Sequence, residues 1–401
     1  MRQRLLAATA LALAGFPSIA MAADEKRPAP IQITVNGYFE AFMAFARQSD
    51  GAGADGIQGT ADDAPGFNRR DNKVSREAEI HFNGQTVLDN GLKVGIHVEF
   101  EAETCADQVD ESFLFFESAD YGRLVLGSTN AAPYTMAVIP PSALPGHGFS
   151  DPRMGEVNVA NVAGVGGNAL GTSVPLVQNL VSGDAEKLTY YSPRLYGFQV
   201  GLSYTPDNCE ENNIGGNALV GAQLACGGSF GGLPPSNNAG QQSEIIEIGA
   251  NYIGKFSGVD VMVSGGYSRA NVEAAPAGTV DWREWSTGAK LGYAGFELGG
   301  AYHRSNQGLS GHNDRQDYAV SLAYTAGPWM GSLGYGHGSL EAGAATGEDR
   351  QGFWEAAVNY QLGPGIKLAG GVQYWRIRDN LSAASAENNA LLFLLGTELT
   401  F

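Results

Sequence analysis

Short segments of alternating polarity, each closed by an aromatic residue, repeat through the second half of the chain. The closing residues form two interleaved series: Tyr252, Tyr293, Tyr324, Tyr360 and Phe401, and Tyr204, Tyr267, Tyr302, Tyr335 and Tyr374. Turns follow the first series and longer loops follow the second. A repeat of β-hairpins with aromatic residues at both strand ends suits a closed sheet that meets the two interfaces of a bilayer. The pattern therefore predicts a transmembrane β-barrel.

The alternation within a segment separates two faces, because successive side chains of a strand point to opposite sides. In the last segment one face carries Leu391, Phe393, Leu395, Thr397, Leu399 and Phe401, and the other carries Gly396, Glu398 and Thr400. The first face suits lipid and the second suits water. A soluble lectin-like sandwich also alternates, but aromatic residues at both ends of a whole series favour the membrane barrel.

The first 23 residues have the three parts of a secretory signal peptide. Arg2 and Arg4 form the positive region, 5–14 are apolar, and 20–22 read Ala-Met-Ala, a small-x-small cleavage site. An anchor helix is the alternative, but the apolar stretch is too short to span a bilayer. We therefore expect an exported chain with a signal peptide at 1–23 and a barrel domain at 24–401.

Net charge and cysteine content indicate which partners and which cellular compartment suit the chain. Removing 1–23 takes away two basic residues and lowers the net charge from −18 to −20, and this acidity argues against nucleic acid as a partner. Cys209 and Cys226 lie in one Gly/Asn-rich insert, which predicts a loop disulfide in an oxidising compartment. Cys105 is left as a lone thiol.

The pattern predicts about sixteen strands, each able to cross a bilayer when tilted. The first expected strands are 31–46, 73–83 and 92–101, and Asn90-Gly91 gives the second and third a tight turn. Connections alternate between short and long along the chain, as in outer-membrane barrels but not in soluble sandwiches. The longest connection is 130–186, and a structureless segment of that length is expected only where it has a function.

Several strand motifs together resemble a known family. They are Glu79–Gly84, 88–95, Asp110-Glu111-Ser112-Phe113, 121–127, 188–193, 197–201 and the terminal Phe401. In these motifs the chain resembles the general porins of Gram-negative outer membranes, most closely the alphaproteobacterial group. The resemblance covers essentially the whole chain after the signal peptide.

This resemblance implies an all-β, 16-stranded antiparallel barrel with a water-filled pore, narrowed by an inward-folded constriction loop at about 130–186. It also implies a homotrimer in the bacterial outer membrane, in contact with outer-membrane lipid and lipopolysaccharide, and a terminal Phe401 that serves as a tag for the barrel-assembly machinery. Pro145-Gly146-His147-Gly148-Phe149 replaces the PEFG-like loop signature of enterobacterial relatives. The geometry of the constriction therefore cannot be transferred from them.

Strand parity assigns charged residues to the lumen wall. They are Glu40, Lys73, Glu77, Glu79, His81, Lys93, His97, Glu99, Glu101, Arg123, Lys187, Lys290, Arg315, Glu355, Lys367 and Glu398. We expect the loop acids Asp151 and Glu156 to face Lys73, Lys93, His97 and Arg123 and to set a transverse field. The alternative is that these charges are merely solvated in a wide lumen. The acids Glu77, Glu79, Glu99 and Glu101 predict a weak cation preference.

An acidic cluster in the first long loop raises the question of a metal. Asp50, Asp55, Asp62 and Asp63 alternate with glycines and could hold calcium, but they lack EF-hand spacing, so a solvated loop is preferred. No other cofactor is expected. The six histidines are scattered and indicate no enzyme. A general diffusion channel is therefore favoured over a channel specific for a sugar or phosphate, and over an outer-membrane barrel enzyme.

Overall fold

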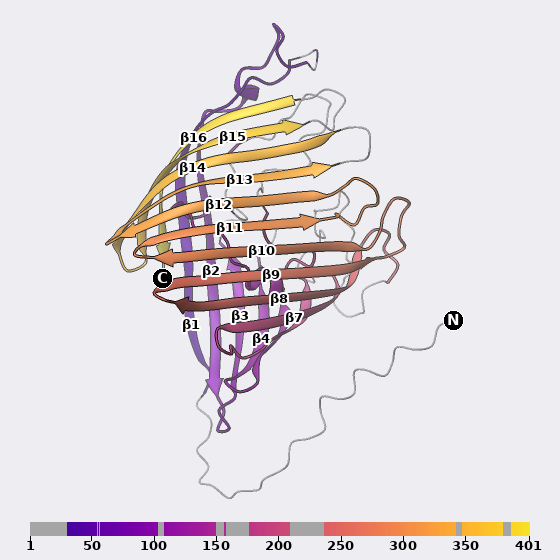
Figure 1. Ribbon diagram of the computed structural model, residues 1–401, viewed down its shortest axis with the longest axis vertical. Helices are drawn as coiled ribbons and strands as arrows, with labels where there is room; N and C mark the ends of the chain where they lie inside the picture. Colours follow the sequence, from indigo (N-terminus) through magenta and orange to yellow (C-terminus); the bar gives the residue numbers. More distant parts are fainter. Residues whose placement is uncertain are drawn as a thin grey trace, which may run out of the picture.

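The computed structural model describes residues 30–53, 55, 57–102, 108–149, 156–157, 176–208, 236–341, 347–379 and 386–401. Within these residues the strands form one closed antiparallel barrel, in sequence order, with β1 paired to both β2 and β16 (Figure 1). The predicted fold class is confirmed. The strands are β1 (Gln32–Arg47), β2 (Asn72–Val87), β3 (Lys93–Glu101), β4 (Ser112–Ser118), β5 (Gly122–Ser128), β6 (Glu186–Tyr191), β7 (Phe198–Asp207), β8 (Gln242–Phe256), β9 (Val259–Val272), β10 (Trp282–Tyr293), β11 (Phe296–Ser305), β12 (Arg315–Ala326), β13 (Trp329–Glu341), β14 (Glu348–Gly363), β15 (Ile366–Asp379) and β16 (Ala386–Thr400).

Short turns join every second pair of strands from β8 to β15, at the end of the barrel where the C-terminus lies (Figure 1). The turn between β8 and β9 consists of Ser257 and Gly258, with φ of 48° and 87°. The turn between β10 and β11 repeats this with Ala294 and Gly295, at 51° and 86°. Two successive positive φ values match the right-handed twist of the flanking strands. Longer connections gather at the opposite end, as the sequence predicts.

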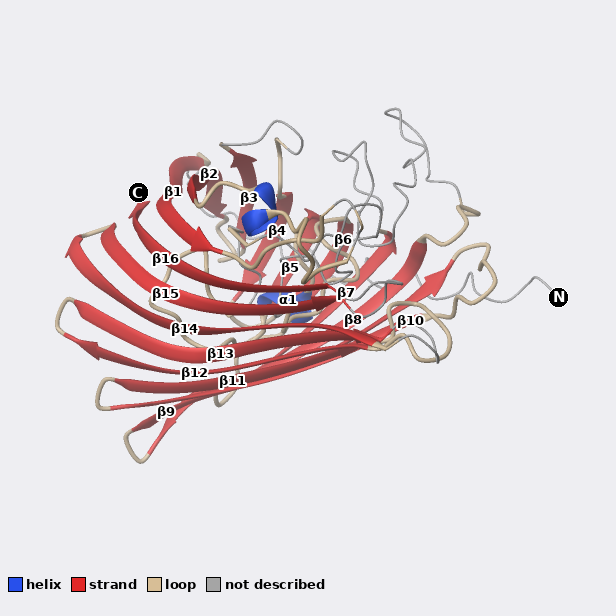
Figure 2. Cartoon of the chain, turned by 90° about the horizontal axis from the view of Figure 1, so that it is seen from above, coloured by secondary structure: helices blue, strands red, loops and turns tan. Residues whose placement is uncertain are grey.

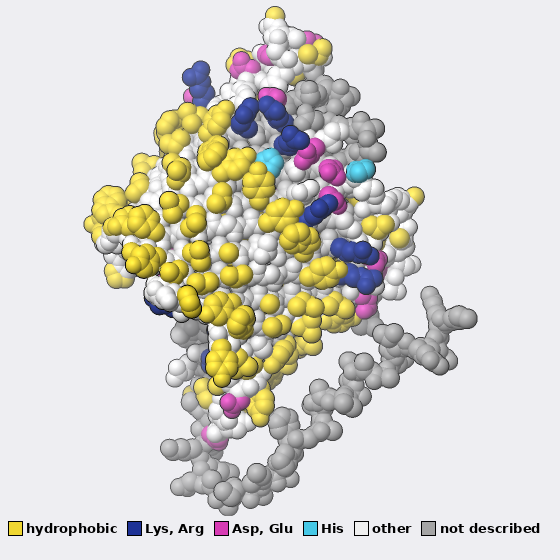
Figure 3. Space-filling view, viewed as in Figure 1, with side chains coloured by type: hydrophobic (Ala, Val, Ile, Leu, Met, Phe, Trp, Pro, Cys, Tyr) yellow, Lys and Arg dark blue, Asp and Glu magenta, His cyan; other side chains and the backbone are white. Residues whose placement is uncertain are grey.

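The outer surface of the barrel is apolar between two rows of aromatic rings. Figure 3 shows hydrophobic side chains spread over the strands, with charged groups near the end that carries the long connections. Near the short turns, the Phe296 ring contacts the Tyr324 ring in a tilted arrangement, with 4.4 Å between ring centroids. In the second row, Tyr335 contacts Trp354 at 4.7 Å. Both predicted rows are therefore present on the outer wall.

The strands do not end at the second aromatic row, as the sequence pattern suggested. β9 continues past Tyr267 to Val272, and β13 continues past Tyr335 to Glu341. The added residues include polar and charged side chains on both faces, which hides them from a search for apolar alternation. The sheet therefore extends beyond its apolar band on the side of the long connections.

The described connections include one tight turn, in which Gly66 and Phe67 have positive φ, and one short helix. The 3-10 turn η1 (Pro65–Asn68) lies between β1 and β2, and α1 (Ala132–Thr135) follows β5. Figure 2 shows α1 inside the ring of strands. No helix in the described part of the chain is long and apolar enough to cross a membrane.

The barrel closes at Phe401, which exchanges two backbone hydrogen bonds with Gly37 of β1. The Gly37 N–H donates to the Phe401 carbonyl at 3.0 Å, and the Phe401 N–H donates to the Gly37 carbonyl at 3.1 Å.

We expect deletion of Phe401 to reduce the inserted, folded fraction of the protein strongly, because it removes both bonds and the terminal aromatic ring. Leu399→Ala on the same lipid-facing row keeps these bonds and is the control. Heat-modifiable migration of protein from isolated outer membranes measures the fraction. Equal insertion of the two variants would contradict the assembly role predicted for Phe401.

Candidate pore constriction

The connection between β5 and β6, residues 129–185, is called the constriction loop here, and its described parts, 129–149, 156–157 and 176–185, contact the inside of the barrel. Three serines of the wall accept hydrogen bonds from its backbone amides. Ala132 N–H donates to Ser203 of β7 at 2.9 Å, Val138 N–H to Ser264 of β9 at 2.8 Å, and Ala143 N–H to Ser332 of β13 at 2.9 Å. The loop backbone thus follows the inner wall across many strands.

Three buried carboxylates of the wall hold other parts of the loop. Ser142 Oγ donates to Glu355 at 2.6 Å, and Ser182 Oγ donates to Glu247 at 2.5 Å. One oxygen of Glu284 accepts both the Leu180 and Val181 amides at 2.9 Å. The sequence prediction names Glu355 as a wall residue but does not name Glu247 or Glu284. Glu284 has the same parity as Lys290 in β10, so the signal was present in the sequence.

Glycines on the inner wall allow this close approach. A Cβ on Gly288 would lie 1.9 Å from the carbonyl oxygen of Val138, and one on Gly249 would lie 2.7 Å from that of Ala132. Loop atoms also crowd the Cβ positions of Gly201, Gly266, Gly299, Gly334 and Gly371. We call these seven residues the glycine track. They make room for the loop, a role that strand parity alone does not reveal.

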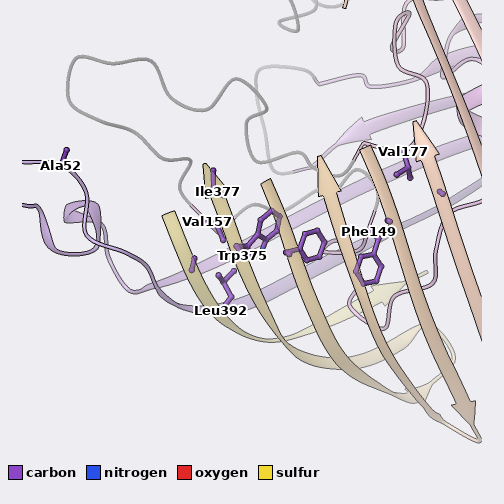
Figure 4. Packing of buried hydrophobic residues seen from close by; sticks show 11 residues of the cluster. Ala52, Phe149, Val157, Val177, Trp375, Ile377 and Leu392 are labelled. Atoms are coloured by element: carbon purple, nitrogen blue, oxygen red, sulfur yellow. The ribbon is translucent and has the colours of Figure 1, made fainter. Parts of the chain in front are cut away.

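An aromatic stack fixes the far part of the loop to β14 and β15. Phe149 of the loop stacks on Phe353 at 5.5 Å, and Phe353 stacks on Trp375 at 4.3 Å, with interplanar angles of 6° and 16°. Figure 4 shows Phe149 and Trp375 in one apolar cluster with Val157, Ile377 and Leu392 on the inside of the sheet. All three rings are buried, so they hold the loop and do not form an open aromatic path for a solute.

Glu156 crosses from the loop to the wall of β2. It accepts a hydrogen bond from Ser75 Oγ at 2.5 Å, and its other oxygen lies 3.1 Å from Nε2 of His147, which is also in the loop. Burial disfavours charge on both groups, but their mutual hydrogen bond and attraction prevail: the pKa of His147 is raised and that of Glu156 is lowered. The positive charge of Lys73 adds to the lowering of the Glu156 pKa.

This buried pair predicts a pH-dependent stability. The contribution of His147 is complete below its ordinary pKa of about 6.5 and is lost as pH rises through the raised value. The contribution of Glu156 is present above about 4.5 and is lost as pH falls through the lowered value. We expect His147→Gln to cost about 3 kcal/mol where both groups are charged. The gap between the denaturation midpoints of wild type and variant should shrink as pH rises through the raised pKa of His147, and a gap independent of pH would contradict the pairing.

The other expected constriction bases have partners elsewhere. Lys93, at the turn end of β3, forms an ion pair with Glu117 at 2.7 Å, and the Arg123 guanidinium lies 4.4 Å from the ring centre of Phe115. Of the four bases expected to face Glu156, Lys73 is the one that the structure brings near it. Lys93 and Arg123 both lie near the short-turn ends of their strands, β3 and β5, and Arg123 pairs across the sheet with Tyr191 of β6. Asp151 lies outside the described residues.

His97 is also turned away from the loop. Its Nε2 lies 3.0 Å from Glu99, in its own strand, and its ring stacks on Phe113. Lys187 is buried at the base of the loop, where its ammonium donates to the Gly183 and Ala185 carbonyls at 2.8 and 2.6 Å and also to that of Thr129. These contacts leave the wall opposite the loop with a marked excess of acids.

The wall acids stand in register on neighbouring strands. Glu40 of β1 pairs across the sheet with Glu398 of β16 and with Glu77 of β2, and Glu79 pairs with Glu101 of β3. Like charges in directly opposite positions destabilise a sheet. Glu40 and Glu77 are buried, whereas Glu79 and Glu99 keep 12% and 13% of their side chains exposed. This concentration of carboxylates is therefore an electrostatic feature of the lumen with a cost in stability.

The acidic outer loop uses its carboxylates on its own backbone. Asp62 accepts the Asp55 amide at 3.1 Å, Asp63 accepts the Gly59 amide at 2.7 Å, and Asp50 accepts the Gly66 amide at 2.9 Å. Among the described residues, the groups whose ligand atoms converge are His81 with His97 and Glu99, and Glu79 with Glu101 and Asp110. Calcium at the aspartates stays a prediction. Cys105, Cys209, Cys226 and the segment 1–23 lie outside the described residues.

A closed barrel whose polar interior is crossed by one long loop defines a membrane channel of the outer-membrane type. Residues 7–380 match the family described as Gram-negative porin. The chain belongs to this family.

Individual similarities are weaker. Two uncharacterised proteins, from Rickettsia bellii (strain RML369-C) and Rickettsia conorii (strain ATCC VR-613 / Malish 7), are 23% and 22% identical over 264 and 258 residues, 56% and 54% of this chain. The matches span 58% and 57% of those relatives. A porin structure refined at 1.8 Å has 13% identity and a TM-score of 0.54, with coverage of 92% of this chain and 100% of the other. OmpT of Vibrio cholerae in its trimer form has 13% sequence identity and a TM-score of 0.58, and the match covers 93% of this chain and 100% of that chain. These structures support the fold.

Proposed function

We propose that this porin is a general diffusion channel for ions and small hydrophilic solutes, with a weak preference for cations. The single observation that carries the proposal is the excess of carboxylates on the β1–β3 wall, while the bases Lys93 and Lys187 are engaged in other contacts. Rings and rows of acids raise the local concentration of cations in a wet pore. Because the Debye length is about 8 Å at physiological salt, the preference should be modest.

The reversal potential of the protein in a planar bilayer under a KCl gradient tests this proposal. A cation-selective sign that fades as the salt concentration rises is expected. An anion-selective sign at low salt would show that Lys73 and Arg123 control the path, and the proposal would be wrong.

A substrate-specific channel is the second candidate. Such a channel needs an exposed aromatic path, but Phe149, Phe353 and Trp375 are buried between loop and wall. Conductance in the presence of sugars or phosphate separates the two candidates, because a specific channel shows saturable block and a general one does not. An outer-membrane barrel enzyme is disfavoured by the family and the fold.

The assembly and export of the channel follow from the same proposal. We propose a homotrimer, a state named for the Vibrio cholerae relative, that contacts outer-membrane lipid and lipopolysaccharide. Export would use the signal peptide at 1–23, and insertion would use the barrel-assembly machinery. Cross-linking of the native protein in outer membranes should trap a trimer, and a monomer alone would contradict this part of the proposal.

A further inference from the structure

Two histidines and a glutamate form a compact group on the inner wall of β2 and β3. His81 lies six residues from Ser75, the contact point of the constriction loop, which is about 20 Å along the strand toward the short turns. His97 and Glu99 lie beside it on β3. The three side chains keep 19%, 15% and 13% of their surface exposed, so solutes in the lumen can reach them.

The spacing of their polar atoms suits a metal ion. His81 Nε2 lies 3.3 Å from one oxygen of Glu99, His97 Nε2 lies 3.0 Å from the other, and the ligand atoms of all three residues fall within 4.8 Å of one another. Bonds of about 2.0–2.2 Å to a tetrahedral zinc ion place neighbouring ligand atoms about 3.4 Å apart. An oxygen of Glu79 lies 2.9 Å from His81 Nε2, so this carboxylate is a further candidate ligand.

The hydrogen bonds around His97 point to the same conclusion independently. Asn83 donates its amide to Asn36 at 2.6 Å, so its oxygen is left to accept from His97 Nδ1 at 2.8 Å. A neutral His97 ring therefore carries its proton on Nδ1 and directs the lone pair of Nε2 at the Glu99 carboxylate. Two electron-rich atoms in this position repel each other unless a proton or a metal ion lies between them. An outer partner that fixes the ring in this way is typical of metal-binding histidines.

We propose that His81, His97 and Glu99, assisted by Glu79, bind a transition-metal dication such as Zn²⁺ on the wall of the pore. Imidazole ligands select such ions, whereas Ca²⁺ and Mg²⁺ prefer sites built from oxygen alone. The exposed side of the group leaves room for water as an additional ligand. The site binds from the lumen and is separate from the contacts that hold the constriction loop.

Calorimetric titration of the folded, full-length protein in detergent with ZnCl₂ tests the proposal. Wild type should bind zinc, His81→Gln/His97→Gln should lose the binding, and Asn83→Ala, which keeps all ligands, should weaken it about tenfold. His312→Gln is the matched control, because His312 is exposed in an outer connection, 74% of its side chain accessible, and should leave zinc affinity unchanged.

Two outcomes would overturn the site. Zinc affinity that is unchanged in the folded double variant would show that the histidines are not ligands. CaCl₂ binding as tight as that of ZnCl₂ would show that the acidic wall attracts any dication. Heat-modifiable migration confirms that each variant is folded. The titration measures no conduction, so its result stands apart from the ion preference under "Proposed function".

Discussion

Replacing Gly288 by valine should lower the unit conductance of the channel and destabilise the seating of the constriction loop. Gly288 faces the lumen from β10, and a Cβ there would lie 1.9 Å from the Val138 carbonyl oxygen, whereas contacts of real Cβ atoms below 3.0 Å are essentially never seen. The loop must therefore move off the wall toward the opposite side of the lumen. That movement breaks the 2.8 Å hydrogen bond from Val138 to Ser264. Overpacking of this kind costs about 1–3 kcal/mol.

Gly265→Val is the matched control for this experiment. Gly265 lies in β9, on the lipid-facing side, and the nearest atom to its Cβ position is 3.9 Å away. The same substitution there adds an apolar side chain to the outer band and leaves the loop untouched. Single-channel recordings of both variants decide the matter. If Gly288→Val conducts like wild type, the glycine track does not determine the width of the pore.

Neutralising four acids of the wall should abolish the cation preference. The variant carries Glu77→Gln, Glu79→Gln, Glu99→Gln and Glu101→Gln. Glu79 pairs with Glu101 across β2 and β3, Glu77 lies two residues away along β2 and Glu99 two residues away along β3, so their removal takes four negative charges from one stretch of the path. The Debye length, over which these charges act, shortens as the salt concentration rises. The difference in permeability ratio from wild type should therefore be largest at low salt. Reversal potentials under a KCl gradient measure it, with the K⁺/Cl⁻ permeability ratio falling toward one.

A second variant removes the same number of charges outside the pore. Asp281, Asp314, Glu348 and Glu387 pair with arginines near the ends of β9, β11, β14 and β15 that carry the long connections. Changing these four to their amides alters the net charge equally but leaves the lumen wall intact. A permeability ratio that shifts as much in this variant as in the first would assign the preference to the overall charge of the protein.

The sequence predicted the barrel because the fold is a repetition of local signals. Alternation assigns each side chain to lipid or lumen, and an error of one residue would place Glu398 in lipid instead of Leu399. In the register, Lys73 pairs with Ala44, Glu101 with Glu79 and Lys367 with Glu398. The strand ends were less accurate, because beyond the aromatic rows no membrane constrains the pattern.

The seating of the loop could not be predicted in the same way. Gly288 and Ser264 are unremarkable strand residues, and their role appears only when Val138, more than a hundred residues away, is placed above them. Position along the barrel axis posed a similar difficulty. Parity shows that Lys93 faces the lumen but not that it lies at the turn end beside Glu117. Contacts between a loop and a distant wall depend on shear and tilt, which single segments do not record.

The hydrogen bonds of the loop reach β2 through Ser75, β7 through Ser203, and β13 through Ser332. A barrel made of a single sheet flattens readily under uneven lateral pressure when no contacts inside it connect opposite parts of the wall. Here an internal crosspiece ties well-separated sectors of the wall together. The width of the pore and the cross-section of the barrel are therefore mechanically coupled. A bilayer of different thickness or tension should change neither without breaking these hydrogen bonds.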